Sequence, residues 1–208
     1  MKEDVVIFNE EELGLTEAIC KLCTEEDELD KRIDIRYIRK YSPEDILSER
    51  EERVYRQQSL IGKYKGTLIV IRVNYPGTNK NNYISFGILK EISALIIAVF
   101  KNFILYKNFE ITAEGPIVTM VLNESCNNAK NKTVEIEENH LLGRCVDIDV
   151  YDENGNSLSR RELGISERKC YLCCSPAQNC VRSRKHSIDE IENFMRLKYQ
   201  QFCDLSIL

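Results

Sequence analysis

Apolar and polar residues follow clear periodic patterns along much of this chain. The stretch Gly66–Val73 is rich in β-branched residues and is followed by Asn74-Tyr75-Pro76-Gly77, which predicts a buried strand ending at a turn. Residues 83–105 are apolar at helical spacing and predict a long central helix. Two further strands are predicted around the turn at Glu114-Gly115, over Phe109–Thr112 and Pro116–Leu122.

Helix-start signals complete this outline. Ser42-Pro43 followed by acidic residues predicts a helix that runs to about Leu60 and ends near Gly62. A capping-box pattern at Ser187–Glu190 opens a C-terminal helix, and residues 127–138 predict a shorter one. We therefore expect an α+β fold, with a mixed or mainly antiparallel sheet packed by the central and C-terminal helices.

The expected domain organisation is simple. Residues 41–208 are predicted to form a single domain that includes a Cys/His-rich segment at 170–186. Residues 1–40 form an acidic N-terminal extension, in which Val5–Phe8 could be a strand and Leu15–Leu22 a helix. We assign this extension no role.

The most informative stretch lies between Cys145 and Tyr151, which is predicted to be a strand. Side chains alternate along a strand, so Asp147 and Asp149 share one face while their apolar neighbours share the other. Two adjacent carboxylates repel each other, and a positive group should lie between them, most simply a divalent cation such as Mg²⁺. The pattern indicates metal-assisted chemistry on a phosphate-bearing substrate, although a hairpin with one solvated face would look the same.

Basic residues around this strand favour the first interpretation. Asn154-Gly155 is a hairpin signal, and a return strand over Ser157–Arg161 would carry Arg160 and Arg161 back past the aspartates. Arg144 stands at the strand entrance, and guanidinium groups match phosphate geometry. His140, just upstream, fits either a general base or phosphate hydrogen-bond donor, or a polar cap on the preceding segment.

A third group of candidates lies on the first helix. Arg50, Arg53 and Gln57 fall on one helical face, which is either a solvated face with Glu–Arg pairs or a clamp for phosphate.

Cysteines form a separate pattern near the C-terminus. Cys170, Cys173, Cys180 and His186 can make a tetrahedral zinc site, although their spacing matches no standard finger. Because all four positions would be protein ligands, such a zinc would be structural. The alternative is reduced, buried thiols, and the flanking basic residues could form a patch for an acidic partner.

Composition and charge narrow the class of protein. The net charge of −5 argues against a nucleic-acid binder, and Lys90, Glu91 and Lys101 argue against a membrane span in Tyr83–Tyr106. Nine cysteines without a visible secretory leader favour reduced thiols in a cytoplasm.

Taken together, these residues resemble a known family, the apo-citrate lyase phosphoribosyl-dephospho-CoA transferases, which are the holo-acyl-carrier-protein synthases of citrate lyase. The resemblance covers about Ile46 to Leu197 and is densest from 140 to 187. The matching residues are Ser48-Glu49-Arg50-Glu51-x-Arg53 with Gln57, His140-x-x-Gly143-Arg144-x-x-Asp147-Ile148-Asp149-Val150, Leu158-Ser159-Arg160-Arg161, Arg168-x-Cys170-x-x-Cys173, Cys180-x-Arg182 and His186.

The resemblance implies an activity. A serine of the apo acyl carrier subunit of citrate lyase would attack the α-phosphate of 2′-(5″-triphosphoribosyl)-3′-dephospho-CoA, and pyrophosphate would leave. This is nucleotidyl transfer, so a nucleotidyltransferase-like fold is expected by analogy of function. Asp147 and Asp149 would hold Mg²⁺, Arg144, Arg160 and Arg161 would neutralise the triphosphate, and the face of Arg50, Arg53 and Gln57 becomes a stronger candidate for a ligand clamp. The alternatives are a transferase for a malonate decarboxylase carrier and a non-catalytic, zinc-stabilised carrier-binding module.

Overall fold

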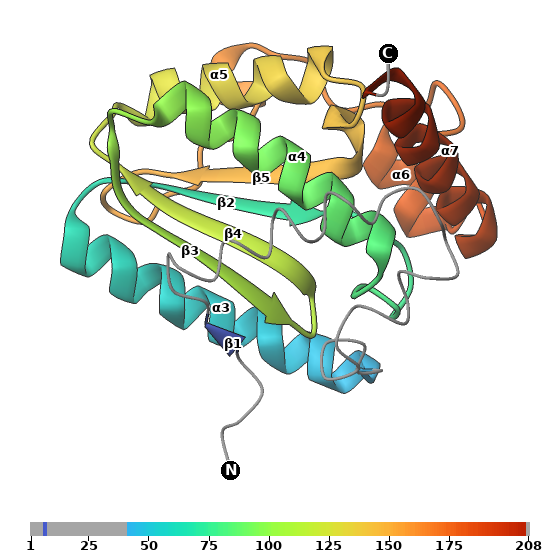
Figure 1. The fold of residues 1–208 in the computed structure, drawn as a ribbon, viewed down its shortest axis with the longest axis horizontal. Helices are drawn as coiled ribbons and strands as arrows, with labels where there is room; N and C mark the ends of the chain where they lie inside the picture. The colour runs from blue at the N-terminus through green and yellow to red at the C-terminus, as the bar shows by residue number, and fades with distance from the viewer. Residues whose placement is uncertain (1–5, 8–40, 207–208) are drawn as a thin grey trace.

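The computed structural model describes residues 6–7 and 41–206, which form an antiparallel sheet with helices on both faces (Figure 1). The strand order is β1-β3-β4-β2-β5, and every neighbouring pair is antiparallel. This confirms the expected α+β class and the mainly antiparallel sheet. The strands are β1 (Val6–Ile7), β2 (Thr67–Val73), β3 (Ile104–Thr112), β4 (Gly115–Leu122) and β5 (Val146–Tyr151).

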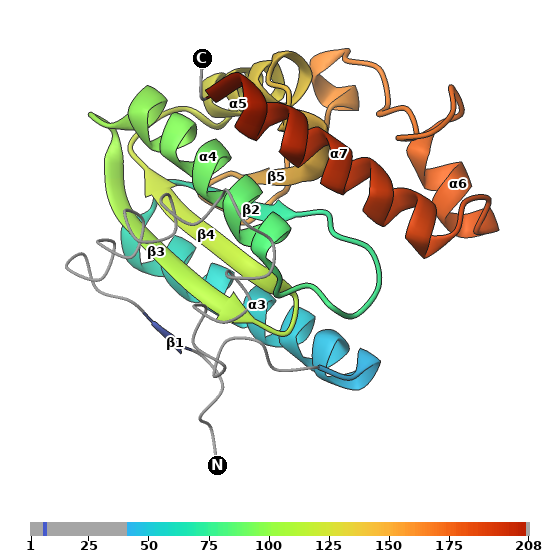
Figure 2. The same ribbon diagram turned by 45° about the vertical axis from the view of Figure 1, so that its right-hand side comes forward.

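Helices cover the two faces of the sheet unequally, as both Figure 1 and Figure 2 show. One face packs the larger core against α4, α5 and α7, and the other packs a smaller core against α3. The helices are α3 (Pro43–Tyr64), α4 (Tyr83–Phe100), α5 (Cys126–Asn139), α6 (Ala177–Ser183) and α7 (Ile188–Ser206). The predicted roles of the central and C-terminal helices as packing elements are confirmed.

Strand β5 shows how the alternation sorts its side chains. Val146, Ile148 and Val150 are buried in the larger core, while Asp147 and Asp149 point to the face of the sheet on which α3 lies. The prediction that the two aspartates share a face is confirmed.

Helix α3 begins as predicted and ends later than predicted. The Ser42 hydroxyl accepts a hydrogen bond from the Asp45 amide, and the Asp45 carboxylate accepts one from the Ser42 amide, which makes a capping box with Pro43 in the first turn. The helix continues through Gly62, beside which there is open space, and stops at Lys65 with φ of 53°. The residue that ends the helix is therefore a left-handed lysine rather than the glycine.

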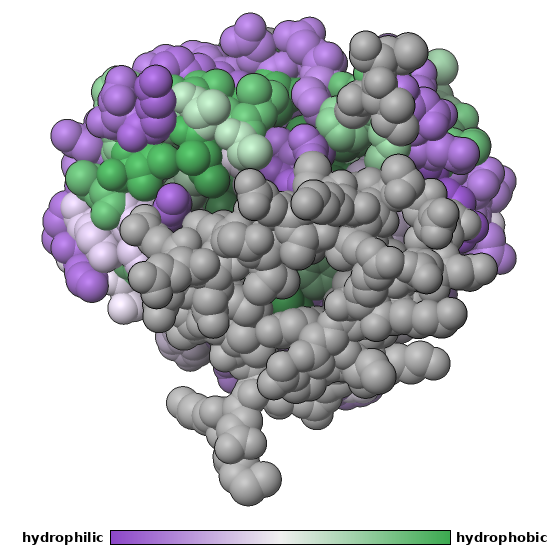
Figure 3. Space-filling model, in the orientation of Figure 1, coloured by the Kyte–Doolittle hydropathy of each residue, from purple (hydrophilic) through white to green (hydrophobic). Residues whose placement is uncertain are grey.

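The boundary between α4 and β3 also differs from the prediction. The helix predicted over 83–105 ends at Phe100, and Ile104 already pairs with Leu122 of β4. The apolar stretch after Phe100 is compatible with both a helix and a strand, and it forms a strand because it pairs with the long strand β4. Helix α4 is long and apolar enough to span a membrane by composition, but it packs on the sheet as a core helix. Exposed apolar side chains gather where α4 ends and β3 begins, at the upper left of Figure 3 (Leu95, Val99, Phe103 and Leu105).

The predicted return strand over Ser157–Arg161 is wrong. The turn itself forms, with Gly155 at φ of 85°, but only a single bridge joins Tyr151 to Ser157 before the chain turns away. The outer edge of β5 is occupied instead by side chains of α5: the Ile148 amide donates to Glu137, and Lys130 donates to the Ile148 carbonyl. These bonds occupy the amide and the carbonyl of Ile148, which a continuing partner strand would need.

The helix expected at Leu15–Leu22 lies outside the described residues.

Candidate functional site

An arginine lies between the two aspartates of β5. Arg72 of β2 faces Asp147 across the ladder, and its Nη2 donates to Asp147 Oδ2 at 2.9 Å and to Asp149 Oδ2 at 2.7 Å. The positive group required by the carboxylate pair is therefore present within the chain. Arg72 bridges one oxygen of each carboxylate, and the aspartate side chains stay 42% and 27% exposed.

A buried glutamate joins this bridge to helix α3. Glu114, in the turn between β3 and β4, accepts hydrogen bonds from Arg53 Nε at 2.6 Å, Arg50 Nε at 3.3 Å and Arg72 Nη1 at 3.4 Å. The side chain of Glu114 is only 4% exposed, whereas that of Arg50 is 57% exposed. Arg72 thus joins the two aspartates to Glu114, and Arg50 and Arg53 lie in the same network.

The electrostatics follow from this packing. Burial raises the pKa of Asp149, as does the neighbouring Asp147, while Arg72 acts in the opposite direction. Burial alone would lower the pKa of Arg72, but Asp149, Asp147 and Glu114 outweigh it and raise that pKa. Arg72 consequently stays charged inside the network.

Gln57 lies apart from the network. It lines a hollow of about 220 Å³ between α3 and β3, and its buried Nε2 has no hydrogen-bond partner in the described structure.

The other arginines predicted to lie beside the aspartates contact other parts of the chain instead. Arg160 donates to Glu137 at 2.6 Å and to Glu138 at 2.8 Å, and Arg161 pairs with Glu167. Arg144 donates to the Lys169 carbonyl and lies 5.8 Å from the centre of the Tyr171 ring. The missing return strand explains the new position of Arg160 and Arg161.

Arg168 takes the place expected for these residues. Its Nη1 donates to the Val146 carbonyl at 2.9 Å and lies 3.7 Å from Asp147 Oδ1, while its Nη2 pairs with Glu137. Glu137, which is 2% exposed at its side chain, thereby holds Arg160, Arg168 and the edge of β5 together.

His140 ends helix α5. Its backbone amide donates to the Ile136 carbonyl, and its Nδ1 accepts from the Leu142 amide at 3.1 Å. The imidazole packs 5.7 Å from the Phe202 ring of α7, and burial lowers its pKa. These contacts match the capping alternative and place the ring beside α7, on the opposite side of the sheet from the aspartates.

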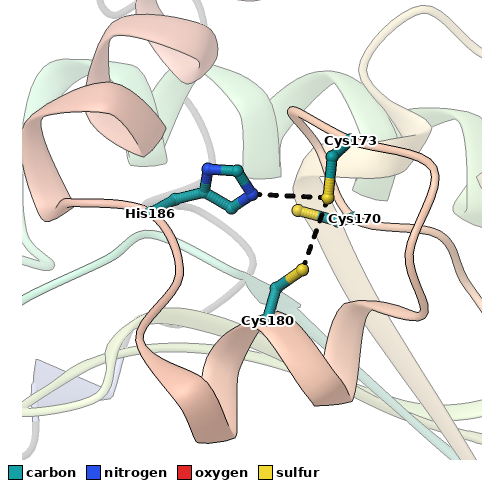
Figure 4. A group of neighbouring side chains, drawn as sticks. All are labelled: Cys170, Cys173, Cys180 and His186. Atoms are coloured by element: carbon teal, nitrogen blue, oxygen red, sulfur yellow. Dashed lines mark hydrogen bonds between the residues drawn. The ribbon is translucent and has the colours of Figure 1, made fainter.

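A second cluster brings the four predicted zinc ligands together (Figure 4). The ligand atoms of Cys170, Cys173, Cys180 and His186 all lie within 4.8 Å of one another. The Sγ atoms of Cys173 and Cys180 are 3.5 Å apart, and His186 Nε2 is 3.4 Å from Cys173 Sγ. Cys174, adjacent to this group, is exposed and lies outside it.

Local structure positions these ligands. The Cys170 amide donates to the Ser175 carbonyl, which closes a turn around Cys173, while Cys180 lies on α6 and His186 follows that helix. The hydrogen bond with His186 lowers the pKa of Cys173 to about 5, followed by bonds from Ser175. A preformed group of three thiols and an imidazole has the donor set that zinc prefers.

Sequence reasoning missed Arg72, Glu114 and Glu137 as members of these networks. Arg72 and Glu114 are single charged residues within or beside an apolar stretch, and a buried charge requires a partner, which is a usable signal. Glu137 lies among other glutamates, and nothing local distinguishes it.

The fold and these networks define a class of protein: an α+β domain whose sheet carries paired carboxylates among guanidinium groups, which is suited to phosphate-bearing ligands. Residues 42–202 match the family model described as apo-citrate lyase phosphoribosyl-dephospho-CoA transferase. The chain therefore belongs to this family, and the resemblance noted in its motifs is confirmed.

Individual relatives agree. The chain is 36% identical to Protein CitXG of Haemophilus influenzae over 73% of its length and 33% of that protein, and 32% identical to Protein CitXG of Leuconostoc mesenteroides subsp. cremoris over 70% and 32%. It thus spans about a third of these longer relatives. It is also 30% identical to the apo-citrate lyase phosphoribosyl-dephospho-CoA transferase of Escherichia coli O7:K1, over 73% of this chain and 84% of that protein.

Proposed function

We propose that this chain is a nucleotidyltransferase-type holo-acyl-carrier-protein synthase. It would transfer 2′-(5″-phosphoribosyl)-3′-dephospho-CoA from its triphosphate precursor to a serine of the apo acyl carrier subunit of citrate lyase. The serine oxygen forms a bond to the α-phosphorus, the bond from that phosphorus to pyrophosphate breaks, and the serine proton is released. The observation that carries the proposal is the pair Asp147 and Asp149 within a network of arginines, in a chain of this family.

Asp147 and Asp149 have the character of a Mg²⁺ site. They are adjacent, partly exposed carboxylates, and Arg72 engages only one oxygen of each. Mg²⁺ held there would neutralise charge on the leaving pyrophosphate. Divalent magnesium binds through one or two carboxylates together with substrate phosphates, which fits this pair.

The arginines supply the anion-binding groups. Arg72 and the exposed Arg50 can reach a triphosphate placed over the aspartates, because both already extend over this face of the sheet. Arg168 stands at the other side of Asp147. Planar guanidinium groups bind phosphate oxygens in pairs, so these three residues are our candidates for holding the triphosphate. In this proposal Arg144 holds the Lys169 carbonyl, while Arg160 and Arg161 pair with glutamates of the surrounding segments.

The decisive experiment mixes the protein with the triphosphoribosyl-dephospho-CoA donor, Mg²⁺ and the apo carrier, and weighs the carrier by mass spectrometry. We expect the carrier to gain the mass of the prosthetic group and pyrophosphate to appear. Asp147→Asn and Asp149→Asn should abolish the gain, while Asp189→Asn, which removes an exposed carboxylate from α7, should not. Full activity in both site variants would refute the assignment.

The same assay separates the alternatives. A mass gain only on a malonate decarboxylase carrier would identify the related transferase. Carrier binding without pyrophosphate release under any condition would favour the non-catalytic module.

We further propose that Cys170, Cys173, Cys180 and His186 bind a structural zinc ion. The preformed geometry supports this proposal, and all four coordination positions would be protein atoms. Elemental analysis of the purified protein should give about one zinc per chain. Cys173→Ser should lose the metal and Cys174→Ser should keep it, because Cys174 lies outside the group; equal zinc contents would contradict the site. The free thiols of the described cysteines suit the reducing cytoplasm that we propose as its location.

A further inference from the structure

One segment of the chain differs sharply in charge from the rest. Residues 168–188 contain five Arg or Lys residues and no Asp or Glu, although the whole chain has a net charge of −5. This segment includes α6 and the Cys/His cluster. This segment is therefore strongly net positive within an acidic chain.

This segment lies at the rim of the molecule, and Figure 2 shows α6 at the right-hand edge, beside the start of α7. On α6 only Cys180 is buried, and Val181 beside it is 74% exposed. We use the name α6 surface for the exposed residues Lys169, Leu172, Val181, Arg182, Arg184 and Lys185.

Two charges of the α6 surface, those of Arg182 and Arg184, are available to a partner, whereas Lys185 Nζ lies 3.6 Å from Cys173 Sγ. Within the described structure, Arg182 and Arg184 form no ion pair. Three acids flank the segment: Glu167 pairs with Arg161, Glu190 accepts hydrogen bonds from Ser187, and Asp189 is an exposed residue in the first turn of α7. An exposed apolar side chain among unpaired cations is typical of a surface that binds an acidic protein.

The α6 surface is connected to the aspartate site by a short path. The Ala177 amide at the start of α6 donates to the Arg168 carbonyl, and an antiparallel backbone bridge joins Lys169 to Pro176. Arg168 in turn lies 3.7 Å from Asp147. A protein seated on α6 would thus lie next to the end of β5 that carries the aspartates.

We propose that the α6 surface is the docking site for an acidic face of the carrier protein. This inference rests on the proposed function, which supplies the carrier as acceptor. The cations accelerate encounter, and Val181 provides an apolar contact at the centre. The Cys/His cluster fixes the position of α6 and so presents these residues as one rigid surface.

The test reverses two charges. Arg182→Glu together with Arg184→Glu should raise the KM for the apo carrier by about tenfold or more, and kcat and the KM for the donor should stay within about twofold. The difference should shrink between about 0.02 M and about 0.3 M NaCl, because salt screens exposed charges. The matched control is Lys63→Glu with Lys101→Glu, which makes the same change in charge at the far ends of α3 and α4. Zinc content and circular dichroism verify that the variants remain folded.

The outcomes separate this inference from the proposed function. If the wild-type protein transfers the group and both double variants show the same carrier KM, the docking proposal is overturned while the function stands. If no transfer occurs, direct titration with the apo carrier still decides: binding that only the Arg182/Arg184 variant loses supports docking. Binding to phosphatidylserine vesicles with an unchanged affinity for the carrier would instead overturn it in favour of a membrane surface.

Discussion

Replacing Glu137 by glutamine is expected to destabilise the fold far more than the same change at Glu138. Glu137 is 2% exposed at its side chain and accepts hydrogen bonds from Arg160, Arg168 and the Ile148 amide. The substitution keeps the size of the side chain and an acceptor oxygen for Ile148, but it removes the charge. Two arginines are then left without their shared buried carboxylate.

The magnitude follows from the burial. Removing one partner of a buried ion pair costs about 3–5 kcal/mol. The side chains of Arg160 and Arg168 are 15% and 21% exposed, so solvent offsets part of the loss and we expect about 3 kcal/mol. Glu137→Ala also removes the acceptor of the Ile148 amide, which adds about 1–3 kcal/mol.

Urea unfolding followed by circular dichroism measures these differences. Glu138 is the matched control, since it is 51% exposed and pairs with the same Arg160. An exposed pair contributes about 0–1 kcal/mol, so Glu138→Gln should be nearly neutral. Equal unfolding free energies for the two glutamine variants would refute the view that Glu137 anchors the edge of β5.

Three further changes probe other parts of the molecule. Arg72→Gln should lower the unfolding free energy by about 2 kcal/mol. Added Mg²⁺ should restore part of this loss, because a cation can replace the lost guanidinium between the aspartates. A melting temperature of the variant that does not respond to Mg²⁺ would argue against a cation site. Gly143→Ala should strongly destabilise the protein, because an added Cβ atom would overlap the carbonyl oxygens of Ile136 and Glu137, and an unchanged melting temperature would contradict the close approach. Burial lowers the folded-state pKa of His140 below the ordinary value of about 6.5, so protonation favours the unfolded state and stability falls as the pH drops below that value. His140→Gln should weaken this dependence in urea titrations at about pH 7 and about pH 5.5, and an identical dependence would mean that His140 is not its source.

Sequence patterns predicted the elements whose signals are local. The alternation in β5, the capping box at Ser42 and the start of α7 are all set by residues within a few positions of one another, and they appear as expected. The cluster of Cys170, Cys173, Cys180 and His186 is likewise compact in sequence, which is why its members could be grouped from their spacing.

The predictions from sequence are wrong where residues distant in the chain determine the local structure. The turn at Asn154-Gly155 forms, but the predicted strand after it does not, because Glu137 and Lys130 of α5 already bind the edge of β5. No local signal reports that an edge is already satisfied by side chains from another element. The prediction that Arg160 and Arg161 lie beside the aspartates depended on this strand and is wrong for the same reason.

The partner of Arg72 can be predicted from the charges in the sequence. A guanidinium inside a buried strand requires an anion, and two aspartates on one face of another strand require a cation. The two requirements are complementary, and together they favour β2 and β5 as neighbours, which is the pairing that the sheet has. The same pairing has a consequence for the proposed reaction: Mg²⁺ must compete with Arg72 for the aspartates, and a triphosphate offers Arg72 an alternative partner. Cation and donor would therefore strengthen each other's binding, because each relieves the cost that the other imposes on this bridge.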